Sequence, residues 1–101
     1  MNTGFHRLSG IETLILELLR GGEMYGLQLV ESSDGRIKRG TVYVTLGRMQ
    51  EKGYMDSRPE QRRKGAIGLP RRLYRATGLG LRVLDAWGLL REQLAWQGTG
   101  R

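Results

Sequence analysis

A run of hydrogen-bond donors in the middle of the chain offers the clearest chemistry in the sequence. Residues 38–54 read KRGTVYVTLGRMQEKGY, in which Val42, Leu46 and Met49 recur at helical spacing and predict a buried face. Around these positions lie the side chains expected to donate hydrogen bonds to a partner, Lys38, Arg39, Thr41, Tyr43 and Arg48. A helix with one apolar face and one basic, hydroxyl-bearing face is suited to contact phosphate oxygens and base edges.

The positive charge of the chain is concentrated around these donors. The formal net charge is +7, and residues 36–75 hold twelve basic and three acidic side chains. Residues 1–35 hold two basic and five acidic side chains, and residues 76–101 hold three and two. Such a segment repels itself, and a bound polyanion would relieve the repulsion. Nucleic acid is the first candidate and an anionic membrane surface the second; a merely solvated basic face is the alternative to both.

Catalytic and metal-binding chemistry has little support in the residues. The chain has one histidine, His6, and no cysteine, which leaves no cluster of metal ligands and no nucleophile–base pair. Asp85 and Glu92 lie seven positions apart on a predicted helix, a pattern typical of solvated carboxylates. The stretch TGLGLR at 77–82 lacks the third glycine of a nucleotide-binding loop. We therefore predict no enzymatic activity and no cofactor.

The overall composition predicts one small globular domain. The chain has 101 residues, of which 39% are hydrophobic and 27% charged. The absence of cysteine fits a reducing compartment. The N-terminus has no apolar run typical of a secretion signal, and no uncharged apolar stretch approaches the roughly 20 residues that span a membrane. We expect a cytoplasmic, bacterial protein without a membrane partner.

Four helices and one hairpin are predicted to position the donors. Ser9 and Glu12 match a capping box, so a first helix is expected to begin there and to end at Gly21-Gly22. The remaining expected elements are a helix at 24–32, the donor-bearing helix closed by Gly53, strands at 54–60 and 71–77, a basic loop at 61–70, and a last helix at about 79–93.

This order of elements is that of a winged helix-turn-helix of the α+β class, mainly α. In such a domain the third helix enters the major groove of DNA and the hairpin, or wing, lies along the backbone. We expect residues 1–77 to form the DNA-binding domain and residues 78–101 a C-terminal dimerisation helix. The wing contributes the basic residues Arg62, Arg63, Lys64, Arg71 and Arg72.

Three short motifs between residues 11 and 80 carry a family resemblance. They are Tyr25-Gly26 after Gly21-Gly22; Gly40-Thr41-Val42-Tyr43 with Leu46, Arg48-Met49 and Gly53-Tyr54; and PRRLYRAT at 70–77 followed by Gly80. In order, they resemble the second helix, the recognition helix and the second wing strand of the PadR family of transcriptional regulators. The chain departs from many members at Lys38-Arg39, where they have Ser-Pro, and at Val44, where they have proline. Its single short last helix resembles the short-tailed subgroup.

The resemblance implies a sequence-specific regulator that binds double-stranded operator DNA, and we expect a repressor. Arg48 and Thr41 are expected to read base edges. Tyr43 resembles the family tyrosine that contacts phosphate, and Lys38 and Arg39 lie at the helix start, where backbone amides favour phosphate. The alternative is a non-specific nucleic-acid-binding or protein-interaction module that uses the same basic wing.

The last helix is more apolar than a small domain can cover. Its continuous stripe consists of Leu79, Val83, Trp87, Leu90 and Leu94, and further leucines lie on other sides. We expect this helix to form a homodimer, and the alternative is that part of it folds back on the first helix. The resemblance places Trp87 near the dimer axis, where short-tailed members hold small, flat aromatic effectors. The stripe by itself explains Trp87, so we favour packing as its main role.

Overall fold

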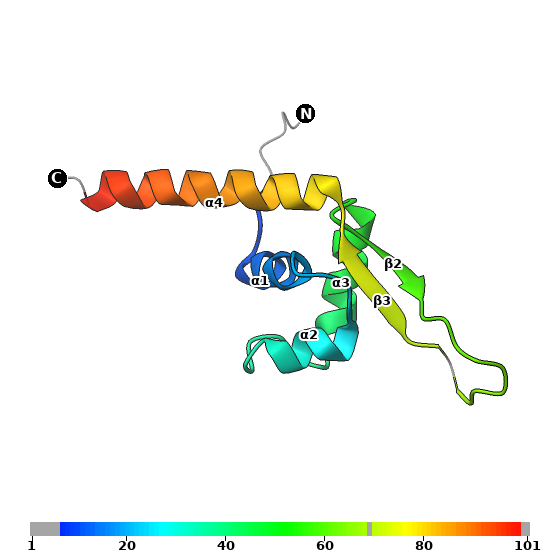
Figure 1. Ribbon diagram of the computed structural model, residues 1–101. Coiled ribbons are helices and arrows are strands. Elements are labelled where there is room, and N and C mark those ends of the chain that lie inside the picture. Colours follow the sequence, from blue (N-terminus) through cyan, green and yellow to red (C-terminus); the bar gives the residue numbers. More distant parts are fainter. Residues whose placement is uncertain (1–6, 69, 100–101) are drawn as a thin grey trace.

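The computed structural model describes residues 7–68 and 70–99, which form four helices and a three-stranded sheet. The elements are α1 (Gly10–Leu19), β1 (Met24–Tyr25), α2 (Gly26–Ser32), α3 (Val42–Glu51), β2 (Met55–Pro59), β3 (Arg72–Ala76) and α4 (Gly78–Thr99). In Figure 1 the three short helices lie together beneath the long α4, and the β2–β3 hairpin extends away from them. The predicted winged helix-turn-helix fold, mainly α, is confirmed.

The first helix begins at its predicted capping box. The Ser9 hydroxyl accepts from the Glu12 amide at 3.1 Å, and the Glu12 carboxylate accepts from the Ser9 amide at 2.9 Å. After α1 the chain turns through Gly22, whose φ of +139° lies in the region that favours glycine. The local pattern therefore fixes where α1 begins and where it ends.

The second helix begins two residues later than the sequence predicts. Met24 and Tyr25 form β1, which pairs antiparallel with β3 through Met24↔Tyr74 and Tyr25↔Leu73. The Tyr25 amide donates to the Gln28 side chain at 2.7 Å, so this bond closes the start of α2. The free edge of β3 takes up the backbone of residues 24–25, and that pairing partner lies about fifty positions away in the chain.

The two predicted strands are present and form the wing. β2 and β3 pair antiparallel from Met55↔Ala76 to Pro59↔Arg72, and β3 is the central strand of the order β1-β3-β2. The sheet thus carries a third, short strand that the sequence pattern did not indicate.

The core lies where α1, α2, α3, the sheet and the first half of α4 meet. Its fully buried side chains are Ile15, Leu16, Leu29, Val42, Leu46, Met49 and Met55. Val83 and Leu84 of α4 join this core and are each 5% exposed. Helix α4 begins at Gly78, directly after the predicted domain boundary at residue 77. The first half of α4 packs into the same core as the preceding elements.

A close approach fixes the start of α4 against the corner between α3 and β2. A Cβ atom on Gly80 would lie 2.0 Å from the Tyr54 carbonyl oxygen, so only glycine fits there. Thr77 donates from its hydroxyl to the Gly53 carbonyl at 2.6 Å and accepts from the Gly80 amide at 3.0 Å. These contacts set the direction in which α4 leaves the domain.

The last helix is longer than predicted, extending to Thr99 instead of Gln93. Its second half continues beyond the three short helices (Figure 1), and Leu89 and Leu94 are 60% and 58% exposed. Among the residues that the structure describes, no helix is long and apolar enough to cross a membrane.

Candidate nucleic-acid interface

Helix α3 buries its predicted apolar face and exposes the opposite face. Val42, Leu46 and Met49 are at most 1% exposed, whereas Tyr43 and Val44 are 52% and 56% exposed. Burial of the first three side chains holds the helix on the domain by its apolar face, at roughly 1.5–3 kcal/mol for each fully buried side chain. The opposite face, which includes Arg48, is left open to a partner.

The turn before α3 presents cations at a helix N-terminus. Thr41 is the N-cap, and its side chain makes no capping bond. The Lys38 carbonyl accepts from the amides of Thr41 and Val42 at 3.2 and 3.0 Å, so Lys38 and Arg39 lie in the turn that precedes the first helical residue. The first turn of α3 contains no acidic side chain. An anion there would meet the positive end of the helix together with two cations.

The Tyr43 ring lies against a glycine of α2. A Cβ atom on Gly26 would lie 2.6 Å from Cε1 and 2.8 Å from the hydroxyl oxygen of Tyr43. The missing side chain at position 26 therefore leaves the space that the ring occupies. Burial raises the pKa of the neighbouring Tyr74 hydroxyl, with a smaller contribution from Tyr43. The sequence analysis named Gly26 only as part of the Tyr25-Gly26 motif and did not identify it as a contact of Tyr43.

A groove connects Tyr43 to the base of the wing. It has a volume of about 400 Å³ and is lined by residues of α2, α3 and the segment at 70–74. Three predicted contact residues from distant parts of the chain, Tyr43, Arg71 and Arg72, line this one groove. Arg48, further along α3, and the wing tip are not part of its lining.

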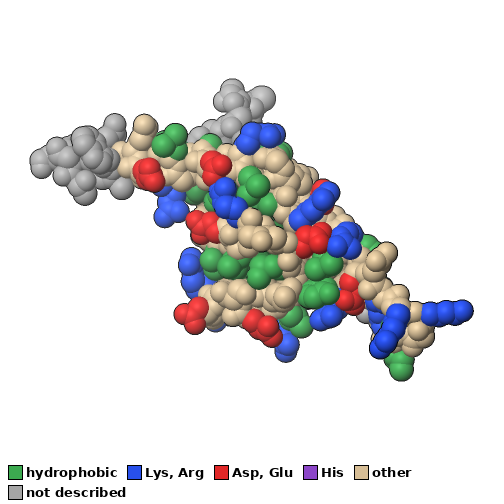
Figure 2. Space-filling model, viewed as in Figure 1, with side chains coloured by type: hydrophobic (Ala, Val, Ile, Leu, Met, Phe, Trp, Pro, Cys, Tyr) green, Lys and Arg blue, Asp and Glu red, His purple; other side chains and the backbone are tan. Residues whose placement is uncertain are grey.

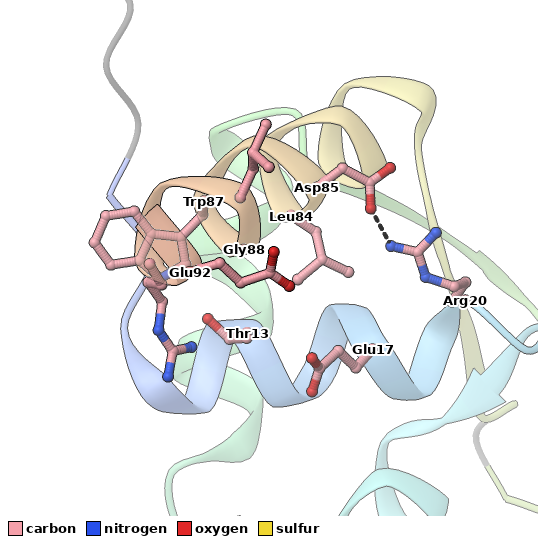
Figure 3. A pocket seen from close by; sticks show the side chains of 10 residues that line it. Thr13, Glu17, Arg20, Leu84, Asp85, Trp87, Gly88 and Glu92 are labelled. Carbon is pink, nitrogen blue, oxygen red and sulfur yellow. Dashed lines mark hydrogen bonds and ion pairs between the residues drawn. The ribbon is translucent and has the colours of Figure 1, made fainter. Parts of the chain in front are cut away.

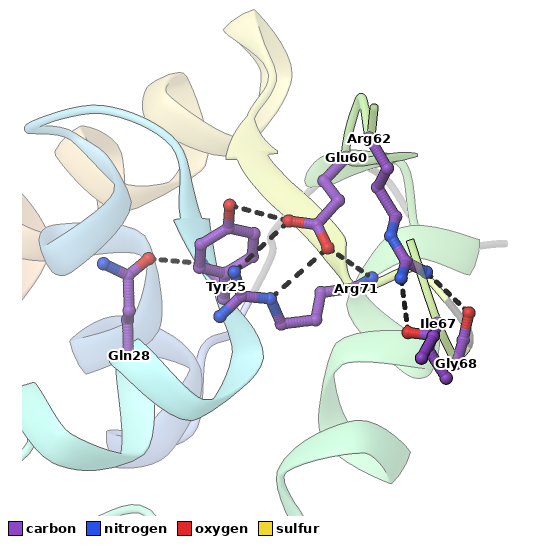
Figure 4. Close-up of polar contacts among 7 residues, drawn as sticks. All are labelled: Tyr25, Gln28, Glu60, Arg62, Ile67, Gly68 and Arg71. Carbon is purple, nitrogen blue, oxygen red and sulfur yellow. Dashed lines mark hydrogen bonds and ion pairs between the residues drawn. The ribbon is translucent and has the colours of Figure 1, made fainter. Parts of the chain in front are cut away.

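The predicted wing-tip cations divide into two kinds. The Arg62 guanidinium donates to the carbonyls of Ile67 and Gly68 and so closes the loop on itself (Figure 4). Gly65 and Gly68 take positive φ values of +90° and +87°, which allow this turn. Arg63 and Lys64 are exposed, and the end of the hairpin is strongly basic in Figure 2. Within residues 7–68 and 70–99, no side-chain hydrogen bond or ion pair engages these two cations.

The two arginines near the start of β3 also differ from each other. Arg71 pairs with Glu60, its Nη2 lying 3.3 Å from Oε1, and its guanidinium lies 4.0 Å from the centre of the Tyr25 ring. Arg72 donates from Nε to the Ser57 hydroxyl at 3.1 Å and remains exposed. The terminal nitrogens of Arg72 can therefore reach a partner, whereas the Arg71 side chain, although 63% exposed, is engaged by Glu60 and Tyr25.

Glu60 is the other residue that sequence reasoning did not identify. Hydrogen bonds from the Arg71 backbone and side chain, and from Tyr25, hold the pKa of the Glu60 carboxyl below its ordinary value. The sequence feature that could have identified Glu60 is an acidic residue within the most basic part of the chain.

The predicted dimer stripe on α4 is split by the fold. Val83 lies in the core, and Trp87 packs against it. Leu79, Leu90 and Leu94 remain partly or largely exposed. A second cavity of about 340 Å³ lies between α1 and α4 and is lined by Trp87, Leu84 and the Arg20–Asp85 ion pair among others (Figure 3).

No group of three or more potential metal ligands occurs among the described residues. His6 lies outside these residues.

Comparisons with known proteins agree on one family. Residues 15–86 match the model of the PadR-like family of transcriptional regulators. The fold is similar to a PadR family regulator from Eggerthella lenta DSM 2243, with 30% identity over 90% of this chain and 83% of that one and a TM-score of 0.66. It is also similar to a PadR family regulator from Clostridium difficile R20291, with 25% identity over 88% of each chain and a TM-score of 0.67.

A third similar structure is that of Bacillus subtilis PadR in complex with operator DNA. Its TM-score is 0.69 at 22% identity, and the match covers 81% of this chain and 47% of that one. At this identity the likeness establishes a shared fold. The comparison with curated proteins gave no match.

Proposed function

Because this chain belongs to the PadR-like family of transcriptional regulators, we propose that it is a cytoplasmic repressor that binds operator DNA sequence-specifically as a homodimer. The observation that carries the proposal is the open polar face of α3 beside a groove that joins Tyr43 to Arg72 of the wing. The fold shared with Bacillus subtilis PadR, whose structure contains operator DNA, supports it.

In the proposed complex, α3 lies in the major groove. An α-helix with its side chains is about 10–12 Å across, which fits a groove about 12 Å wide. Arg48 and Thr41 read base edges, with arginine preferring guanine. Tyr43 donates its hydroxyl to a phosphate, and Lys38 and Arg39 contact phosphate at the helix start.

The wing contributes sequence-independent affinity in this proposal. Arg63, Lys64 and Arg72 are exposed wing cations that form no ion pair within residues 7–68 and 70–99, so they can reach the DNA backbone. Neutralising phosphates releases counterions, so this part of the binding free energy should weaken as salt rises.

A titration against operator and random DNA at several salt concentrations tests the proposal. Fragments bound from the source genome would first supply the operator. We expect a preference for the operator that persists at high salt, because base contacts are not driven by counterion release. Equal affinity for both duplexes at every salt concentration would instead support the non-specific module.

Variants of the wing tip test its role. Arg63→Ala and Lys64→Ala together should weaken binding to both duplexes equally and lower the slope of log K against log salt by about 0.9 for each lost phosphate contact. Arg82→Ala, which removes an exposed cation from the first half of α4, is the control. A double variant with the slope of the control would show that the wing tip is only solvated.

The homodimer is proposed to form through the exposed half of α4. Leu89 and Leu94 present apolar surface there, and a second copy would bury it and space two α3 helices for half-sites about one DNA turn apart. Light scattering should give a dimer for the wild type and for Leu90→Met, and a monomer for the Leu90→Glu, Leu94→Glu variant. A monomeric wild type would overturn this part of the proposal.

A small aromatic effector completes the proposal, and the cavity between α1 and α4 is its candidate site. Trp87 lines the α1–α4 cavity and also packs against the core (Figure 3). An effector at this place would act on α4 and hence on the spacing of the two α3 helices.

A further inference from the structure

An acidic side chain at the base of the basic wing stands out because its charge opposes DNA binding. Glu60 directly follows β2, and the segment that contains it, residues 36–75, holds twelve basic side chains. The Glu60 side chain is only 16% exposed. A negative charge near DNA phosphates is unfavourable, so its presence there requires a different benefit.

The Glu60 carboxylate is bonded on both sides of the wing base (Figure 4). Its Oε1 accepts from the Tyr25 hydroxyl at 3.0 Å and from Arg71 Nη2 at 3.3 Å. Its Oε2 accepts from the Arg71 backbone amide at 3.2 Å, and the Glu60 amide donates to the Arg71 carbonyl at 2.8 Å. Glu60 therefore connects the end of β2 both to the residue before β3 and to β1.

Tyr25 anchors this arrangement to the helical part of the domain. Its ring lies 4.0 Å from the Arg71 guanidinium, a distance typical of a cation–π contact. Its amide donates to Gln28 of α2, and its backbone pairs with Leu73 of β3. Tyr25, Glu60 and Arg71, here called the wing-base triad, thus form a closed set of contacts between the helices and the wing.

The wing-base triad lies at the base of the hairpin, between the β2–β3 ladder and the loop that carries the wing tip. The last rung of the β2–β3 ladder is Pro59↔Arg72, and Glu60 and Arg71 are the next pair outward. Beyond them the loop at 61–70 carries Arg63 and Lys64 and extends away from the helices (Figure 1). A small change of angle at the triad would therefore move the wing tip by a larger distance.

We propose that the wing-base triad is a positioning device that holds the wing at the angle at which its tip meets the DNA backbone. Arg71 in this assignment acts through Glu60 and Tyr25 and is not itself a phosphate contact. The inference rests on the proposed function, because the wing has a partner only if the protein binds DNA. Neutralising Glu60 should then weaken binding, although charge alone predicts the opposite.

The test compares the removal of one negative charge at two carboxylates. Glu60→Gln keeps the size of the side chain and removes the charge that pairs with Arg71. Asp34→Asn is the matched control, because Asp34 is exposed, lies outside the groove lining and has no ion pair within residues 7–68 and 70–99. Affinity for operator and for random DNA would be measured by fluorescence anisotropy at several salt concentrations, with circular dichroism confirming that each variant is folded.

We expect Glu60→Gln to bind both duplexes about tenfold more weakly, the loss expected for one or two backbone contacts, and to show a smaller salt slope. Asp34→Asn should bind as tightly as the wild type or more tightly. Tyr25→Phe, which removes one hydroxyl and keeps the ring, should weaken binding in the same direction. The double variant Tyr25→Phe, Glu60→Gln should lose no more DNA affinity than Glu60→Gln alone, because the Tyr25 and Glu60 side chains act through each other.

The outcomes separate this inference from the proposed function. A wild type and Asp34→Asn that bind no DNA would refute the proposed function. If the wild type binds DNA and Glu60→Gln binds as tightly or more tightly, the positioning role is refuted. A Glu60→Gln variant that melts earlier but keeps wild-type affinity and salt slope would show that the triad only stabilises the fold.

Discussion

Replacing Gly26 with alanine should weaken DNA binding through a residue that the mutation does not change. The new Cβ would lie 2.6 Å from Cε1 and 2.8 Å from the hydroxyl oxygen of Tyr43. Carbon atoms in contact normally lie about 3.5–4.0 Å apart, so the ring must move by roughly 1 Å. Because the Tyr43 side chain is 52% exposed, it can move outward without disturbing the core.

The size of the effect follows from the contact that Tyr43 is proposed to make. A hydrogen bond to a charged group contributes about 1.5–3 kcal/mol, and its loss would weaken binding about 10- to 150-fold. A phosphate contact reads no base, so operator and random DNA should lose affinity equally. The free energy of unfolding should change by less than about 1 kcal/mol, since the displaced ring is flexible and exposed.

Fluorescence anisotropy at one fixed salt concentration measures the loss, with Gly10→Ala as the control. Gly10 is the first residue of α1, as Gly26 is of α2, and a Cβ there would meet nothing within 4 Å. Gly26→Ala combined with Tyr43→Phe should bind no more weakly than Tyr43→Phe alone. If Gly26→Ala binds as tightly as Gly10→Ala, the proposed link between Gly26 and Tyr43 is refuted.

Three further predictions concern recognition, folding and charge. Arg48→Ala should lose about 1–3 kcal/mol of discrimination at one operator position, measured with single-base operator variants, and an equal loss on every sequence would make Arg48 a backbone contact. Gly80→Ala should destabilise the fold by about 1–3 kcal/mol or more in chemical denaturation, because the new Cβ meets backbone, whereas Gly88→Ala on the same helix meets nothing and should not destabilise. Hydrogen bonds from Arg58 hold the pKa of the Glu23 carboxyl below its ordinary value of 4.5. The stability that this pair contributes is therefore present above pH 4.5 and is lost as the pH falls through the lowered pKa. Arg58→Ala should return the pKa of Glu23 to its ordinary value, measured by NMR titration of the carboxyl group.

Patterns that span a few residues were sufficient to predict most of the fold. The capping box at Ser9 and Glu12, the apolar spacing of α3 and the alternation in β2 and β3 each concern neighbouring positions. Their physical cause is local, since hydrogen-bond caps and side-chain periodicity act within a turn or two of chain. The exposure of Tyr43 and the burial of Met49 followed from the same periodicity.

Properties that depend on distant partners were decided only by the tertiary structure. Met24 and Tyr25 are a strand because the edge of β3 is free to pair with them, and Val83 is a core residue because α4 crosses α1.

The predicted contact residues show the same limit. Arg62, Arg63 and Arg71 are the same residue type in the same basic segment. Loop carbonyls engage Arg62, and Glu60 and Tyr25 engage Arg71, whereas Arg63 is left available to a partner. The sequence determined that this region is basic. Which of its charges can reach DNA depends on neighbours that only the folded chain brings within hydrogen-bonding distance.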